Sequence, residues 1–214
     1  MAAVWHTGGV AITPKQLAEL ERRVSGKRRV AEPVLAATPA ARMPARASNQ
    51  VILGVDPSLR GTGYGVVRMS QPHPVALAHG TITCPSDWPH SRCLLQIMQR
   101  LRDIIQQHHP TVCAVEGLFF AQNLKTAIVM GEARGAGMAV MAEAGLEIYE
   151  LATRKVKQAM VGHGGAQKLA VAKMVQRLLR LEALPAPDAA DALALALTYA
   201  QETGRFSLNT PKQI

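Results

Sequence analysis

Four carboxylates stand in this sequence at positions where each would be costly as ordinary surface charge. Asp56 and Glu116 each end a short apolar run, and Asp188 and Asp191 stand three residues apart in an alanine- and leucine-rich segment. Burial of several unpaired acids is strongly unfavourable unless they are neutralised or bind a cation. Oxygen ligands of this kind suit Mg²⁺ or Mn²⁺. Two such ions about 4 Å apart can stabilise both the attacking and the leaving oxygen of phosphodiester hydrolysis.

Each acid also has a structural explanation when it is taken alone. Asp56 could cap the turn that follows it, Asp188 could be a helix N-cap, and Glu116 could end a strand in solvent. Taken together, the four have no comparable set of buried basic residues in the same segments to pair with them. On a helix Asp188 and Asp191 are about 60° apart and share one face. The sequence therefore favours one site that contains all four acids.

Basic and aromatic residues near the acids are candidates for binding an anionic substrate. Arg154, Lys157 and Lys168 flank a glycine-rich loop, 161–165, whose backbone could approach phosphates. Of the adjacent Phe119 and Phe120, one is expected in the core, while the other could stack on a base. A basic stripe of Lys173, Arg177 and Arg180 is typical of a solvated helix face.

The elements that must position these residues form an α/β domain in the order β-β-β-α-β-α-β-α-α. Alternating and continuous apolar runs predict strands at 51–56, 63–68, 75–83, 112–116 and 147–151. Helical periodicity predicts helices from 91 to about 109, and at about 124–144, 166–182 and 188–201. The fold class is thus a mixed five-stranded sheet with helices on its faces. The ends of central strands in such a sheet open onto one crevice.

Composition sets the class of protein. The chain has 214 residues, 48% of them hydrophobic, with a net charge of +9, which predicts one main domain and an anionic partner. Its three cysteines include no Cys-x-x-Cys pair, which favours reduced thiols over disulfides or a zinc site. No apolar run approaches the roughly 18 residues that span a bilayer. We expect a cytoplasmic protein.

Three regions follow from the same patterns. Residues 1–49 carry eight basic and three acidic side chains, a net charge of +5, and are expected to be a basic, largely flexible extension with one short helix from Thr13 to about Val24. Residues 50–203 form the catalytic domain, and residues 204–214 form a short C-terminal tail.

Five separated segments closely resemble the RuvC family of crossover-junction endodeoxyribonucleases. They are 52–67 (ILGVDPSLRGTGYGVV), 115–123 (VEGLFFAQN), 131–135 (GEARG), 154–162 (RKVKQAMVG) and 188–194 (DAADALA). The resemblance implies an RNase H-like fold, a homodimer, and Mg²⁺-dependent paired nicking of four-way (Holliday) junctions in recombination and repair, in cooperation with the RuvA-RuvB branch-migration complex. Mn²⁺ could substitute, and two ions are expected in each active site.

The resemblance also assigns roles to residues. Asp56, Glu116, Asp188 and Asp191 look like the catalytic metal ligands. Phe119 resembles an aromatic residue that stacks near the exchange point of the junction. Lys157 and Lys168 resemble lysines that contact DNA near the scissile phosphate. Arg154, from its place beside the glycine-rich loop, completes the set of expected DNA contacts.

Some alternatives stay open from the sequence alone. The 49-residue extension departs from the family pattern, so it is either an added binding arm or the result of a misassigned start, with Met43 nearer the true beginning. Another RNase H-like nuclease with a different nucleic-acid substrate is the main alternative function. A junction-binding protein without cleavage and an actin-like sugar or acid kinase, suggested by the glycine turn at 61–63, are less favoured.

Overall fold

The computed structural model describes residues 49–117, 123–204 and 211–214. The expected N-terminal arm up to residue 48, with its short helix, and the pair Phe119 and Phe120 lie outside the described residues. Within those that are described, no helix is long and apolar enough to cross a membrane.

A mixed sheet of six strands, in the order β3-β2-β1-β4-β5-β6, forms the centre of the domain. The first three strands, β1 (Val51–Asp56), β2 (Gly61–Arg68) and β3 (Val75–Thr83), form an antiparallel meander. β1 then pairs in parallel with β4 (Val112–Glu116), and β4 pairs in parallel with β5 (Glu147–Leu151). The last strand, β6 (Lys212–Gln213), runs antiparallel to β5.

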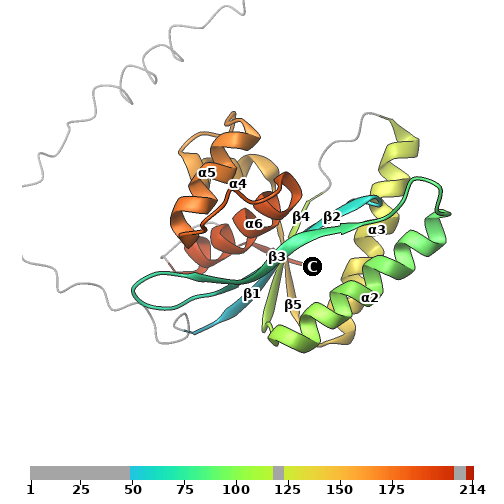
Figure 1. Cartoon of the computed structure of the whole chain (residues 1–214), viewed down its shortest axis with the longest axis horizontal. Helices are drawn as coiled ribbons and strands as arrows, with labels where there is room; N and C mark the ends of the chain where they lie inside the picture. The colour runs from blue at the N-terminus through green and yellow to red at the C-terminus, as the bar shows by residue number, and fades with distance from the viewer. Residues whose placement is uncertain (1–48, 118–122, 205–210) are drawn as a thin grey trace, which may run out of the picture. The chain divides into compact units, whose positions relative to one another are not determined.

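Helices cover both faces of the sheet, as Figure 1 shows. One face carries α2 (His90–His108) and α3 (Leu124–Glu143). The other carries α4 (Thr153–Val161), α5 (Lys168–Leu179) and α6 (Pro187–Gly204). Alternation along β1 explains the two cores, because Ile52 packs in the cluster with α4 to α6 and its neighbour Leu53 in the cluster with α2 and α3.

Glycines let α6 lie directly on the sheet. A methyl group added at Gly54 would come within 1.9 Å of the Ala192 carbonyl oxygen, and one added at Gly63 within 2.1 Å of the Asp188 carbonyl oxygen. No side chain fits between these backbones, so the helix backbone packs against the strands of the hairpin. This close packing sets the height of Asp188 and Asp191 above the strand ends.

The expected fold class is confirmed, and two elements were missed. The structure contains the expected strands and helices in the expected order, and adds α4 and the short sixth strand β6. α4 has only two buried apolar positions, Val156 and Met160, which is too few for a clear helical period. β6 has two exposed residues and is defined by its backbone pairing with β5, which no side-chain pattern reports.

Boundaries also differ in places. α5 begins at Lys168, two residues after the expected start. It ends at Leu179, before the expected 182, because Arg180 takes a left-handed conformation with φ of 52°. β2 begins at Gly61, two residues before the predicted start. The three cysteines, Cys84, Cys93 and Cys113, are free and buried, as expected of reduced thiols.

Candidate active site

Asp56 and Glu116 lie side by side because their strands are parallel neighbours. β1 and β4 are paired in register at Val55 and Val115, so the next residue of each strand emerges at the same edge of the sheet. Both carboxylates are half-buried. Their side chains share a hydrogen bond, with one carboxyl group donating to the other when a proton is present. The expected convergence of these two strand ends is therefore observed.

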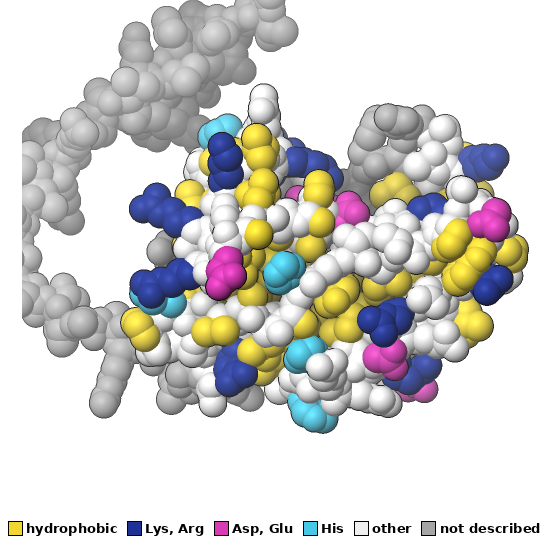
Figure 2. All heavy atoms as spheres, in the orientation of Figure 1, with side chains coloured by type: hydrophobic (Ala, Val, Ile, Leu, Met, Phe, Trp, Pro, Cys, Tyr) yellow, Lys and Arg dark blue, Asp and Glu magenta, His cyan; other side chains and the backbone are white. Residues whose placement is uncertain are grey.

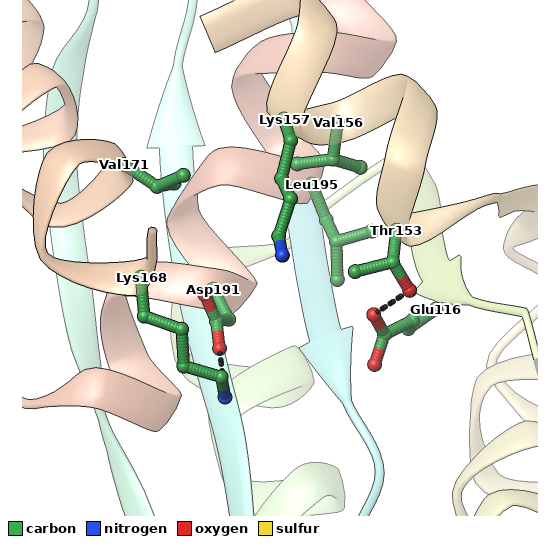
Figure 3. A pocket seen from close by; sticks show the side chains of 8 residues that line it. All are labelled: Glu116, Thr153, Val156, Lys157, Lys168, Val171, Asp191 and Leu195. Atoms are coloured by element: carbon green, nitrogen blue, oxygen red, sulfur yellow. Dashed lines mark hydrogen bonds and ion pairs between the residues drawn. The ribbon is translucent and has the colours of Figure 1, made fainter. Parts of the chain in front are cut away.

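A pocket opens beside these strand ends and is lined by residues from β4, α4, α5 and α6 (Figure 3). It encloses about 450 Å³, open solvent at its mouth included. Two acids, Glu116 and Asp191, and two lysines, Lys157 and Lys168, provide its charged groups, and the rest of its wall is Thr153, Val156, Val171 and Leu195. Charged groups of both signs thus face one small space with an apolar floor.

The neighbouring acids strongly affect the pKa of Asp56. Burial, the hydrogen bond with Glu116 and the charges of Glu116 and Asp191 raise the pKa of Asp56 to about 8, against an ordinary value of 3.8, while Lys168 acts in the opposite direction. Desolvation and nearby like charge both disfavour the ionised form of an acid. Three carboxylates from three different elements therefore form one electrostatic unit. A cation in their midst would relieve the repulsion.

Among the described basic side chains, that of Lys168 lies nearest to these three carboxylates. Its ammonium group lies 2.8 Å from Oδ2 of Asp191, at the first turn of α5. This hydrogen bond raises the pKa of Lys168, partly opposed by desolvation. The lysine side chain is 68% exposed and that of Asp191 is 24% exposed. The lysine can therefore leave the acid for another anion without breaking any packed structure.

The donor chemistry of the site fits a hard divalent cation. Its ligands are all carboxylate oxygens, which suit Mg²⁺ or Mn²⁺ and not the softer metals. In the described part of the chain, no three acidic, histidine or cysteine side chains are close enough to surround an ion as they stand. Glu116 accepts a hydrogen bond from Thr153 and Asp191 from Lys168. To bind a shared ion, Asp191 would have to turn from Lys168, whereas Glu116 keeps one oxygen that points away from Thr153 (Figure 3).

Four of the predicted site residues are not among the residues that line the pocket: Asp56, Asp188, Arg154 and Phe119. The Asp188 carboxylate lies beside Gly61, where its Oδ2 would be 3.2 Å from an added methyl group, on the β2 side of the acids. Arg154 lies over Gly164 in the glycine-rich loop, and a methyl group at that glycine would come within 2.4 Å of the arginine Cγ. Phe119 falls outside the described residues.

Two further residues hold Glu116 and were not singled out from the sequence. Thr153 Oγ1 donates a hydrogen bond of 2.5 Å to the Glu116 carboxylate, and Arg134 Nε donates one of 3.3 Å to the Glu116 carbonyl oxygen. Arg134 lies in the segment 131–135 that contributed to the family resemblance, so that segment was a signal. For Thr153 the signal was weaker, a hydroxyl residue two positions after a strand end.

The basic stripe of α5 is exposed, as expected of a solvated face. Lys173, Arg177 and Arg180 all lie on the surface. Figure 2 shows basic side chains at separate points on the face it presents, with uncharged and apolar side chains between them. The pocket lysines, Lys157 and Lys168, lie closer to the acids than this stripe does.

Comparison with known proteins identifies close relatives. The family model described as crossover junction endodeoxyribonuclease RuvC matches residues 52–199. The crossover junction endodeoxyribonuclease RuvC of Akkermansia muciniphila is 45% identical over 148 residues, which cover 69% of this chain and 89% of that protein. The protein of the same name from Pseudomonas putida is 47% identical over 151 residues, which cover 70% of this chain and 86% of that protein.

Solved structures of RuvC proteins are also similar to this chain. The structure of T. thermophilus RuvC in complex with a Holliday junction substrate is similar with a TM-score of 0.71 and 33% identity, and the match covers 77% of this chain and 99% of that one. A further structure of Thermus thermophilus RuvC is similar with a TM-score of 0.67 and 31% identity, over 77% of this chain and all of that one. The yeast mitochondrial Holliday junction resolvase Ydc2, at 11% identity and a TM-score of 0.51, shares the fold.

Proposed function

Because this chain belongs to the RuvC family of crossover junction endodeoxyribonucleases, we propose that the pocket between β4, α4, α5 and α6 is the site at which it hydrolyses DNA. The enzyme is a phosphodiester hydrolase that resolves four-way (Holliday) junctions, as its relatives' names and the junction complex of a 33% identical protein indicate. Family membership decides against the kinase alternative.

One observation carries the assignment of the site. Asp56, Glu116 and Asp191 come from β1, β4 and α6, yet the burial and charge that they share raise the pKa of Asp56 to about 8. A structural role does not require carboxylates from three separate elements to lie close enough to interact. An acid with a strongly shifted pKa beside a pocket is typical of a functional site. We therefore assign the catalytic role to this cluster, together with Asp188 one turn before Asp191.

The four acids would hold Mg²⁺, or Mn²⁺ in its place, in one or two sites. When bound, such ions polarise the scissile phosphate and lower the pKa of an attacking water. Asp56 and Glu116 would bind from the strand ends, and Asp188 and Asp191 from α6. The rigid packing of α6 on Gly54 and Gly63 supports this arrangement, because it fixes the height of the helix above the strands.

The lysines of the pocket would bind the DNA backbone. The Lys157 side chain points into the pocket between the two carboxylates, and Lys168 reaches Asp191 from α5 (Figure 3). A phosphate that enters the pocket offers Lys168 a second anionic partner and lets Asp191 turn toward a cation. Arg154 and Phe119 are proposed as more distant DNA contacts, from the family motifs in which they stand.

We propose that the enzyme acts as a homodimer, since resolution of a junction needs two paired nicks. Leu124 and Ile128 support this, because they lie one turn apart on α3 and are 77% and 53% exposed. Exposed apolar neighbours of this kind mark interaction surfaces. Cooperation with a RuvA-RuvB branch-migration complex and a cytoplasmic location are proposed from the family alone.

The direct test is cleavage of a synthetic four-way junction by the purified protein with Mg²⁺ or Mn²⁺. We expect symmetrical paired nicks from the unaltered protein, and binding without cleavage from Asp56→Asn. Asp103→Asn on the surface of α2 is a matched control that should cut normally. Equal cutting of linear duplex would disprove the selectivity for junctions, and binding without any cleavage by the unaltered protein would disprove the enzymatic assignment.

A further inference from the structure

Arg134 is a half-buried arginine that the proposed chemistry does not use. It lies in the middle of α3 and its side chain is only 14% exposed. One terminal nitrogen lies 2.5 Å from Oε2 of Glu150 on β5, and the other lies 2.9 Å from the Met138 sulfur. Its Nε donates to the carbonyl oxygen of Glu116 at 3.3 Å. The guanidinium therefore joins α3 to the ends of two parallel strands.

The geometry of these contacts is more specific than that of a simple ion pair. A guanidinium donates in a fixed, planar fork, so its partners are held at set angles to one another. The ion pair with Glu150, which is itself 20% exposed, sets the plane of the fork. The remaining donor is then directed at the Glu116 main chain, where the strand ends and the chain enters the segment that leads to α3.

Thr153 holds the same glutamate from the other side. It is the first residue of α4, two positions after Leu151, which is the partner of Glu116 in the β4–β5 pairing. Its hydroxyl donates to Oε1 of Glu116, while the other carboxylate oxygen points away from Thr153 (Figure 3). Gly117 N also donates to the Leu151 carbonyl oxygen at 3.0 Å, which ties the end of β4 to β5.

We propose that Arg134 and Thr153 are positioning residues that fix Glu116 for the reaction, Arg134 through its main chain and Thr153 through its carboxylate. This inference rests on the proposed role of Glu116 as a ligand of a divalent ion. Hydrogen bonds to a ligating carboxylate set its orientation and typically change metal affinity or activity by 10–100-fold when they are removed. Neither residue touches the reacting atoms.

The two contacts have separable consequences. Loss of the Thr153 hydroxyl frees the carboxylate to rotate, so it should weaken ion binding and raise the Mg²⁺ concentration that cleavage needs. Loss of the Arg134 fork moves the end of β4, so it should lower the maximal rate even at saturating Mg²⁺. Neither change removes a DNA contact, so junction affinity in the absence of divalent ions should stay within about twofold.

The experiment compares Thr153→Val, Thr153→Ser and Arg134→Lys with the unaltered chain. Mn²⁺ affinity is measured without DNA, from the electron paramagnetic resonance signal of the free ion, and cleavage is measured across a Mg²⁺ series. Thr153→Val should weaken Mn²⁺ binding roughly tenfold or more, and Thr153→Ser should restore it. Arg134→Lys keeps the charge but loses the fork, and should lower the cleavage rate at least tenfold with junction binding intact.

Matched controls separate positioning from general damage. Thr111→Val removes a hydroxyl bond to the Val51 carbonyl oxygen at the opposite end of β4, and Arg102→Lys alters the exposed pair with Glu143. Both should behave as the unaltered protein. A Thr153→Val protein with unaltered Mn²⁺ affinity would overturn the carboxylate half of the proposal, and full cleavage by Arg134→Lys would overturn the main-chain half.

The outcome is distinct from failure of the proposed function. If the unaltered protein does not cut junctions, the functional assignment fails, while the Mn²⁺ measurements still decide whether Thr153 orients Glu116. Thermal melting of every variant is recorded beside these data. Should Arg134→Lys prove unstable, Glu150→Gln tests the same fork from its other partner, and a normal cleavage rate there would contradict the proposal.

Discussion

At the scale of single residues, the raised pKa of Asp56 makes the stability of the ion-free protein depend on pH. The carboxyl group keeps its proton in the folded chain up to a pH of about 8, whereas in the unfolded chain it loses the proton near its ordinary value of 3.8. Between these two pH values, ionisation of Asp56 lowers the free energy of the unfolded chain but not that of the folded chain. The free energy of unfolding of the ion-free protein should therefore fall as the pH rises through this window.

The variant Asp56→Asn should escape this loss. In a chelating buffer at pH 8.5 we expect it to melt several degrees above the unaltered protein, because each unit of pKa shift corresponds to about 1.4 kcal/mol. The difference should shrink toward pH 4, and saturating Mg²⁺ should reverse it. The measurement is a set of thermal melts across pH. Asp103→Asn, an exposed acid paired with Arg100, is the control, and parallel melting curves for Asp56→Asn and the unaltered protein would contradict the prediction.

Sequence patterns predicted the two acids at the strand ends, and they did so for a physical reason. Asp56 and Glu116 could be placed because an acid that ends an apolar run must emerge at a strand end. The position of Asp188 beside Gly61 could not be predicted, since it depends on how closely α6 packs on the sheet. Arg134 and Thr153 were missed as partners of Glu116, because they stand 18 and 37 residues from it in the sequence.

At the scale of elements, the contact between α6 and the β1–β2 hairpin positions half of the acids. Gly63 lies under the Asp188 carbonyl oxygen, and any side chain there must displace the helix. This makes the hairpin glycines part of the site, although they carry no functional group.

The substitution Gly63→Ala should therefore reduce cleavage by at least 100-fold and destabilise the protein by several kcal/mol, since the helix has to move. Thermal melting and the junction assay measure the two effects. Gly135→Ala is the matched control, because an added methyl group there has open space and alanine favours a helix over glycine. It should leave cleavage unchanged and stabilise the protein by up to about 1 kcal/mol. A Gly63→Ala protein with normal activity would show that α6 can shift without disturbing the acids.

The elements themselves were largely predictable, and the two that were missed share a cause. Long helices such as α2 and buried strands such as β1 have clear apolar periods that local sequence reports. α4 has nine residues and β6 has two, so tertiary packing and backbone pairing decide them. Local pattern cannot report either of these.

At the scale of the whole molecule, the exposed apolar residues of α3 bear on assembly. Leu124→Asp combined with Ile128→Asp should convert a dimer into a monomer, because it introduces charge into the surface that we propose to be the interface. Light scattering coupled to gel filtration measures the mass. The exposed Leu184, changed to Asp, should leave the mass unaltered. A double variant that remains dimeric would place the interface elsewhere.

The distribution of charge gives a second prediction at this scale. Residues 1–48 contain eight basic and three acidic side chains, which is +5 of the total of +9. Deletion of these residues should leave cleavage at low salt intact and should make junction binding less sensitive to salt, since fewer phosphate counterions are released. Binding measured from 50 to 200 mM salt tests this. Lost cleavage at low salt would show that the segment is part of the catalytic unit.

The last four residues of the chain affect how the protein is handled and how it avoids self-association. Ile214 N donates to the Ile148 carbonyl oxygen at 3.0 Å, and β6 covers part of the outer edge of β5. An open strand edge is a template for pairing with other chains, so β6 protects the part of β5 that it covers from such pairing. A purification tag fused after Ile214 could disturb the pairing of β6 with β5. Tags therefore belong at the other end of the chain.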